Sequence, residues 1–140
     1  MKTPALARSI AKLTLTKKAS NVLLMDLRQL TTMTDYFVIC SADSDTQMKA
    51  IADAVEDGLE KKGVRLWHRE AGSEQWILLD YVDVVVHVFH KNVRSFYNLE
   101  RLWGDAVMEQ VTDNGRLPEK RAVARVRQRR TGASRKRVAG

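Results

Sequence analysis

The sequence predicts a single α/β domain with a mixed β-sheet and helices on its faces. Three observations support this fold class. Short, nearly continuous apolar stretches that are typical of strands occur between residues 22 and 89. Stretches with helical apolar spacing lie before, between and after them. The chain has 140 residues, of which 44% are hydrophobic and 29% charged, and this suits one domain with its own core.

A first helix is expected within the first 19 residues. Leu6, Ile10 and Leu13 lie on one stripe of that helix, and Pro4 is suited to its first turn. No acidic residue precedes Asp26, so a basic targeting peptide is an alternative interpretation. We favour a helix that packs on the domain, because it runs directly into an apolar strand.

Two strands and a second helix are expected next. The strands are predicted at residues 22–26 and 35–40, where the runs are apolar on both faces. A helix then begins after residue 45 and continues to about residue 62, and Gly63 is a typical stop signal. Its buried face consists of residues at helical spacing: Met48, Ile51, Ala52, Val55 and Leu59.

Three further strands and a last helix complete the predicted domain, which spans residues 1–106. The last two strands form a hairpin-like pair. The last helix is expected at residues 92–103 and is closed by Gly104. The three strands are expected at residues 64–69, 75–81 and 83–89.

Residues 107–140 are predicted to be a basic, disordered tail. The net charge is +7, but residues 116–140 alone hold ten Lys or Arg and one acid, which leaves 14 basic and 16 acidic residues before them. The folded part is therefore mildly acidic. The tail suits either sequence-independent contact with RNA phosphates or a solvated extension without a specific role. The candidate RNA contacts are Arg121, Arg125, Arg127, Arg129 and Arg130.

The stretch LLDYVDVVVHVFH, residues 78–90, contains the residue types of a metal or acid–base site. Along a strand, Asp83 and His87 would stand ~13 Å apart, because each residue rises roughly 3.3 Å, and this is too far to share one zinc ion. A nucleotidyltransferase would need two carboxylates on one side of a strand, whereas the spacing of Asp80 and Asp83 places them on opposite sides. We therefore expect no metal, no cofactor and no enzymatic activity. A nucleotide-processing enzyme on a nucleotidyltransferase-like fold is the alternative.

The cysteine content and the hydropathy bear on the compartment. The single cysteine cannot form an intramolecular disulfide, so nothing indicates a secreted protein. No apolar run approaches the ~18–20 residues that a membrane span requires. These features favour a cytoplasmic protein without membrane contact.

A partner-binding surface is predicted on the strand at residues 75–81. Trp76, Leu78 and Asp80 alternate onto one face of this strand. An aromatic anchor beside a charge is typical of protein interfaces, and the alternative is a core tryptophan beside an aspartate at the strand end. We include Tyr81, which follows Asp80, in the surface. Three further acids are candidates to pair with basic residues of the partner: Asp83, Glu70 and Glu100.

Three motifs, in order along the chain, give a resemblance to a known family. They are DYFV at residues 35–38, the run at residues 76–89, and FYNLERLW at residues 96–103. With these motifs the chain resembles the ribosomal silencing factor family, also called Iojap-like proteins, over about residues 20–106. The basic tail lies outside the family pattern as the motifs define it.

The resemblance implies a fold similar to a nucleotidyltransferase core without its catalytic residues. It also implies binding to ribosomal protein L-fourteen on the intersubunit face of the large ribosomal subunit. Bound there, such a factor blocks joining of the small subunit and represses translation when nutrients are limiting. Members that look like this chain are often homodimers when free. The acid-free first helix leaves a mitochondrial or plastid member as the alternative to a cytoplasmic one.

Overall fold

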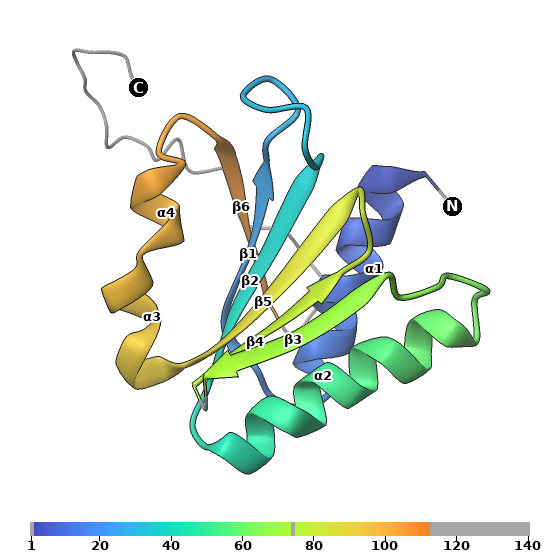
Figure 1. Cartoon of the computed structure of the whole chain (residues 1–140), viewed down its shortest axis with the longest axis vertical. Helices are drawn as coiled ribbons and strands as arrows, with labels where there is room; N and C mark the ends of the chain where they lie inside the picture. The colour runs from blue at the N-terminus through green and yellow to red at the C-terminus, as the bar shows by residue number, and fades with distance from the viewer. Residues whose placement is uncertain (1, 74, 113–140) are drawn as a thin grey trace.

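The computed structural model describes residues 2–73 and 75–112 (Figure 1). Helices and strands alternate along the chain much as the apolar pattern predicts. The elements, in chain order, are α1 (Thr3–Leu15), β1 (Ser20–Asp26), β2 (Tyr36–Ala42), α2 (Asp45–Glu60), β3 (His68–Ser73), β4 (Trp76–Asp80), β5 (Val84–His90), α3 (Lys91–Tyr97), α4 (Leu99–Leu102) and β6 (Val107–Val111).

The strands form a six-stranded sheet in the order β3-β4-β5-β2-β1-β6. β2 and β5 are parallel neighbours at its centre, and the other neighbouring pairs are antiparallel. The chain between β2 and β5 crosses over through α2 and then forms the β3–β4 hairpin. The predicted α/β class with a mixed sheet is therefore confirmed.

One face of the sheet is covered by α1 and α2 (Figure 1). Alternate strand residues such as Val38, Leu79 and Val86 are fully buried there, together with Ile10 of α1 and Ile51 of α2. Because side chains alternate along a strand, the residues between them point to the opposite face of the sheet. The first helix thus packs on the domain, as expected.

The second helix has local signals at its start, its middle and its end. Ser44 caps it by accepting a hydrogen bond at Oγ from the Gln47 N–H, at 3.0 Å. Gly58 faces α1 so closely that a Cβ atom there would lie 2.5 Å from Cδ2 of Leu13. Gly63 follows with a φ of +78°, a left-handed conformation that suits glycine at a helix end.

The other face is partly covered by α3 and α4, which do not form the single helix expected at residues 92–103. Asn98 has a φ of 44°, in the left-handed region, and its Oδ1 accepts a hydrogen bond from the Arg101 N–H at 3.3 Å. Asparagine adopts this conformation more readily than most residues, so it can end one helix and cap the next. The break allows α4 to turn relative to α3.

Arg94 of α3 ties this helical pair to the sheet. Its Nη1 donates to the Asn21 carbonyl at 2.6 Å and to Ser41 Oγ at 2.9 Å. Its Nε and Nη2 donate to the same Glu100 oxygen, at 3.1 and 2.9 Å. One buried guanidinium therefore links β1, β2, α3 and α4.

The third strand starts later than expected. The sequence pattern predicts residues 64–69, whereas β3 begins at His68 and runs antiparallel to β4, with His68 opposite Asp80. Val64 and Leu66 pack against the main core as partly buried side chains of the preceding connection. Their apolar spacing reflects this packing and not a strand, so the spacing misplaces the element by a few residues.

The strand β6 corrects the expected end of the domain at residue 106. It pairs antiparallel with β1 and forms one edge of the sheet. Only Met108 and Val111 are buried, while Glu109 pairs with Arg8 of α1 at 3.3 Å. An edge strand with so few buried residues has little apolar signal, which is why the pattern did not reveal it.

Candidate functional site

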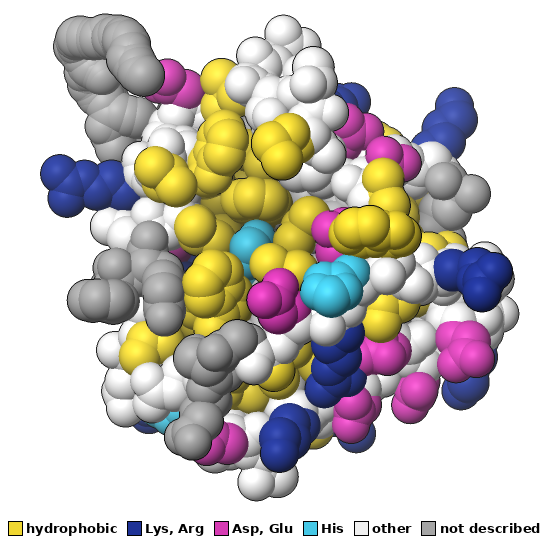
Figure 2. All heavy atoms as spheres, in the orientation of Figure 1, with side chains coloured by type: hydrophobic (Ala, Val, Ile, Leu, Met, Phe, Trp, Pro, Cys, Tyr) yellow, Lys and Arg dark blue, Asp and Glu magenta, His cyan; other side chains and the backbone are white. Residues whose placement is uncertain are grey.

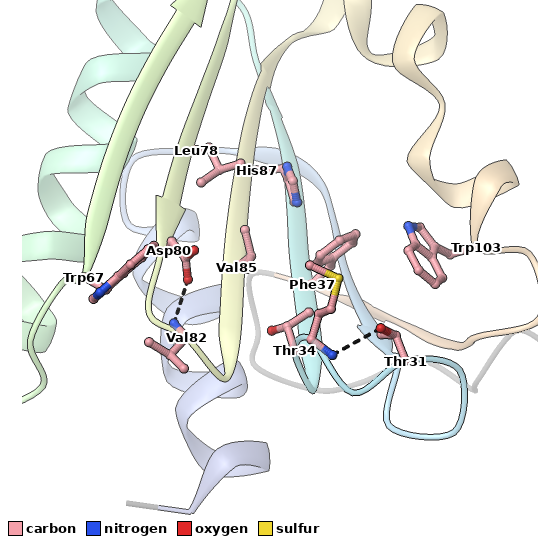
Figure 3. A pocket seen from close by; sticks show the side chains of 11 residues that line it. Thr31, Thr34, Phe37, Trp67, Leu78, Asp80, Val82, Val85, His87 and Trp103 are labelled. Carbon is pink, nitrogen blue, oxygen red and sulfur yellow. Dashed lines mark hydrogen bonds between the residues drawn. The ribbon is translucent and has the colours of Figure 1, made fainter.

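The part of the second sheet face that α3 and α4 leave open forms an apolar pocket of ≈ 630 Å³. Figure 2 shows hydrophobic side chains gathered over the centre of this face. The side chains that line the pocket come from β2, β4 and β5, from the β1–β2 and β4–β5 loops, from the residue before β3 and from the residue after α4 (Figure 3). They are Thr31, Met33, Thr34, Phe37, Trp67, Leu78, Asp80, Val82, Val85, His87 and Trp103.

The strand register brings the floor of the pocket together. Leu78 of β4 lies opposite His87 of β5, and Asp80 lies opposite Val85. On the other side of β5, Phe37 of β2 is the neighbour of Val85 in the parallel pair. Residue 37 is far in sequence from residues 78 and 87, and only the sheet order places it beside them.

A strained turn between β4 and β5 forms part of the rim. Val82 has a φ of 75°, and the Asp83 N–H donates to the Tyr81 carbonyl at 2.9 Å, so Val82 is the centre of a three-residue turn. Asp80 supports the turn because its Oδ1 accepts from the Val82 N–H at 2.7 Å. A β-branched residue in this conformation is costly. Its side chain is 54% exposed, so core packing does not explain the strain.

Large apolar side chains stand exposed around the pocket. Met33 is 86% exposed and Trp67 is 70% exposed. On the side of α4, Trp103 meets Phe37 edge-on, with ring centroids 6.0 Å apart. Exposed aromatic and methionine side chains around an apolar hollow are typical of protein-binding surfaces.

His87 is a buried polar residue in the floor of the pocket. It is 4% exposed, and its Nδ1 accepts a hydrogen bond from Nε1 of Trp76 at 3.2 Å. Burial lowers the pKa of His87 from 6.5 to about 3, so the imidazole is neutral near pH 7. The ring of Phe37 packs edge-on against it, with centroids 4.5 Å apart.

The four residues predicted for the centre of the partner surface do not all lie together in the structure. Leu78 and Asp80 line the pocket. Trp76 lies on the same face, but its ring stacks on Phe89 with centroids 5.1 Å apart, in an apolar cluster that includes Met25 and Ile39, and it does not line the pocket. Tyr81 is 6% exposed and belongs to the core on the opposite face, so the structure does not bring it together with the other three.

The predicted acids have different surroundings. Glu70 is exposed on β3, opposite Leu78, and Asp83 is exposed in the turn before β5. Neither lines the pocket. Glu100 is held by Arg94 in a partly buried ion pair at 2.9 Å. The candidate RNA contacts of the tail lie outside the described residues.

Several pocket residues escaped the sequence analysis: Phe37, Trp67, Val82, Val85, His87 and Trp103 among them. Phe37 and Val85 were assigned to apolar strands, and nothing in a single strand distinguishes an open face from a covered one. Trp67 carried a usable signal, since a tryptophan beside the polar residues His68 and Arg69 has little chance of complete burial. The position of Trp103 depends on the break at Asn98.

Within the described ranges 2–73 and 75–112, no three His, Cys, Asp or Glu side chains are grouped as a metal ion would require. In the same part of the chain, no helix has both the length and the apolar character needed to cross a bilayer. Cys40 is buried in the core, and burial raises its thiol pKa to about 12.

Comparisons with known proteins agree with the motifs. The family model described as "Ribosomal silencing factor during starvation" matches residues 1–139. A ribosomal silencing factor of Bacillus subtilis is 46% identical over 91 residues, 64% of this chain and 77% of that protein. The chloroplastic Iojap protein of Zea mays is 37% identical over 71% of this chain and 44% of that protein. A crystal structure from Chromobacterium violaceum is 31% identical, with a TM-score of 0.72 over 74% of this chain and 88% of that one.

The open sheet face, with its apolar side chains and Asp80, is a binding surface. Together with the family match, it indicates a binding protein of the translation machinery. The chain belongs to the ribosomal silencing factor family. Members of this family are regulators of translation and not enzymes, which sets aside the nucleotide-processing alternative. The match also runs over residues 1–139, so the motifs underestimated the extent of the family pattern.

Proposed function

We propose that this protein binds the large ribosomal subunit through ribosomal protein L-fourteen and sterically blocks joining of the small subunit. The consequence is repression of translation when nutrients are limiting. Family membership supports the general role, since the relatives are ribosomal silencing factors. Blocking a surface requires binding alone, and this suits a family without enzymatic activity.

The observation that carries the proposal is the open pocket on the sheet. It combines exposed anchors, Trp67, Met33 and Val82, with the carboxylate of Asp80 at its edge. Apolar anchors provide most of the binding energy of an interface, and a charge selects the partner and its orientation. The mildly acidic folded part suits the basic surface of a ribosomal protein.

Sucrose-gradient sedimentation of purified subunits tests the proposal. Adding the protein should reduce the peak of joined ribosomes, and the protein should sediment with the large subunit. A joined peak that is unchanged at saturating protein would refute steric blocking. Sedimentation with the small subunit alone would refute the assignment of the partner.

Asp80→Asn tests whether the pocket is the binding site. The amide keeps an oxygen for the Val82 N–H, so the turn is retained while the negative charge is removed. We expect slower association with purified L-fourteen and a weaker dependence on salt, with a Kd about tenfold higher. The control is Asp57→Asn, which removes the same charge from the exposed side of α2, across the sheet. Equal effects of both substitutions would indicate general charge and not a site.

We further propose that the protein acts in the cytoplasm, because the relative at 46% identity is bacterial.

We also propose that the protein is a homodimer when free. A second copy covering the exposed rim of Met33, Trp67 and Val82 would remove this apolar surface from water. Light scattering should then show a dimer that dissociates when L-fourteen is added. A monomer at all concentrations would exclude the dimer and leave the ribosomal proposal in place.

A further inference from the structure

Two residues that line the pocket have buried polar atoms without a hydrogen-bond partner among the described residues. They are His87, through Nε2, and Thr34, through Oγ1. Buried polar groups are nearly always paired in folded proteins, because an unpaired group gives up its bonds to water and receives nothing in return. Both atoms lie beside the surface that we propose binds a partner.

The hydrogen bond from Trp76 fixes the form of His87. An indole N–H can only donate, so Nδ1 of His87 must accept and therefore has no proton. Because the ring is neutral, its one proton is on Nε2, the atom without a partner. Trp76 thus makes Nε2 of His87 a hydrogen-bond donor.

The two parts of the pocket therefore differ in their polar groups. Figure 3 shows the His87 ring directed toward Phe37 and into the pocket, with Asp80 nearer the Val82 turn. One end of the pocket offers a negative charge, and the floor offers a neutral donor. A cationic group suits the Asp80 end and is disfavoured at the floor, where an N–H would face it.

We propose that His87 is a specificity-determining residue, whose Nε2–H donates to a neutral acceptor that the ribosomal partner inserts into the pocket. The acceptor is an amide or peptide carbonyl on an otherwise apolar anchor, and Thr34 supplies a second hydroxyl contact to the same segment. Nε2 has almost no solvent contact in the free chain, so the proposed contact requires Phe37, whose ring packs on His87, to move aside when the anchor enters. This inference rests on the proposed function, because the occupant is a segment of L-fourteen.

Nitrogen-15 NMR of the histidine rings tests the donor directly, in the wild-type chain. In the free protein, His87 should show a protonated Nε2 and an unprotonated Nδ1. Adding purified L-fourteen should move the Nε2–H proton downfield, as expected for a new hydrogen bond to oxygen. A proton on Nδ1, or an Nε2–H resonance unchanged at saturation, would overturn the inference.

A pair of substitutions gives the second measurement. Glutamine places an amide N–H close to the position of Nε2, whereas leucine keeps the bulk and removes the donor. His87→Leu should weaken L-fourteen binding about tenfold, while His87→Gln should stay within about threefold of the wild type. Equal binding by all three proteins would mean that Nε2–H remains against the Phe37 ring, and the inference would fall.

The outcomes separate the two proposals. Wild-type protein that does not bind L-fourteen overturns the proposed function, and this inference with it. Wild-type protein that binds, together with a folded leucine variant that binds equally well, overturns only the role of His87. If the leucine variant does not fold, the NMR measurement on the wild type decides.

Discussion

His87 and Val82 show how single residues in this protein depart from what stability alone would select. His87 is kept neutral by burial, and its donor has no partner among residues 2–73 and 75–112. Val82 holds a conformation that few β-branched residues adopt, and its side chain stands at the rim. Both residues belong to the same pocket. Strained and unpaired groups that concentrate at one place are typical of a functional site.

The lowered pKa of His87 predicts a pH dependence of stability. In the unfolded chain His87 takes up a proton below about pH 6.5, whereas in the folded protein it does so only near pH 3. The contribution of His87 to the free energy of unfolding is therefore complete above pH 6.5 and declines as the pH falls toward 3. Between pH 7 and 5 the free energy of unfolding should fall by about 2 kcal/mol.

Urea denaturation at several pH values measures this decline, and His87→Gln is the control. The variant should lack this part of the pH dependence, while every other titratable group is the same in both proteins. Parallel curves for the two proteins would show that His87 titrates at an ordinary pKa.

Val82→Gly should stabilise the free protein while it weakens binding. Glycine adopts a φ of 75° without strain, so the free energy of unfolding should rise by about 1 kcal/mol. Removing an exposed apolar side chain at the rim should raise the Kd for L-fourteen severalfold. Val107→Gly is the matched control, because Val107 is also exposed but has the ordinary backbone of a strand, where glycine destabilises. A decrease in stability for Val82→Gly would contradict the assignment of strain.

At the scale of elements, the α3–α4 pair determines how much of the sheet stays open. Asn98 breaks the helix, Arg94 and Glu100 fasten both halves to β1 and β2, and Trp103 follows as one wall of the pocket. Glu100 is among the acids expected to contact the partner, but its position beside Arg94 gives it a structural partner within the chain. The position of the wall therefore depends on an ion pair and not on a long helix.

Glu100→Ala should destabilise the protein by about 2–3 kcal/mol, because it leaves the guanidinium of Arg94 in a largely buried place without its carboxylate. Arg101→Ala, on the exposed side of α4, should have little effect. Guanidinium denaturation measures both. The double variant Arg94→Met with Glu100→Leu should recover only part of the stability, since no unpaired charge remains but the Asn21 carbonyl and Ser41 Oγ lose their donor. Equal destabilisation by Glu100→Ala and Arg101→Ala would show that the pair contributes nothing.

For the whole molecule, charge is divided between a mildly acidic folded part and a basic tail. The ten Lys or Arg of residues 116–140 have no aromatic residue among them, so base stacking is not available to them. We propose that this tail contacts ribosomal RNA phosphates and raises avidity, while the pocket provides specificity.

Replacing five tail arginines by glutamine tests this role without changing the chain length: Arg121, Arg125, Arg127, Arg129 and Arg130. Affinity for the large subunit should fall mainly at low salt, measured as Kd across a salt series. The slope of log affinity against log salt should become shallower by roughly 0.7–0.9 for each RNA phosphate that the variant no longer neutralises. Subunit joining should still be blocked. An unchanged slope would show that these arginines do not touch RNA.

The sequence by itself determined the fold class, most element positions, the family and the absence of catalysis, because these depend on local apolar patterns and on motifs. It also found Leu78 and Asp80, whose shared face follows from strand alternation alone. The strand β6 escaped because an edge strand buries few residues, and the helix break at Asn98 depends on one backbone conformation.

Only the tertiary structure decided which sheet face stays open. The order of strands places β2 beside β5, and the helices α1 and α2 cover the side of Tyr81. Tyr81 therefore joins the core, while Phe37, Val85 and His87 join Leu78 and Asp80 around one pocket. Alternation divides a strand into two faces, but which face is covered depends on contacts between residues far apart in the chain.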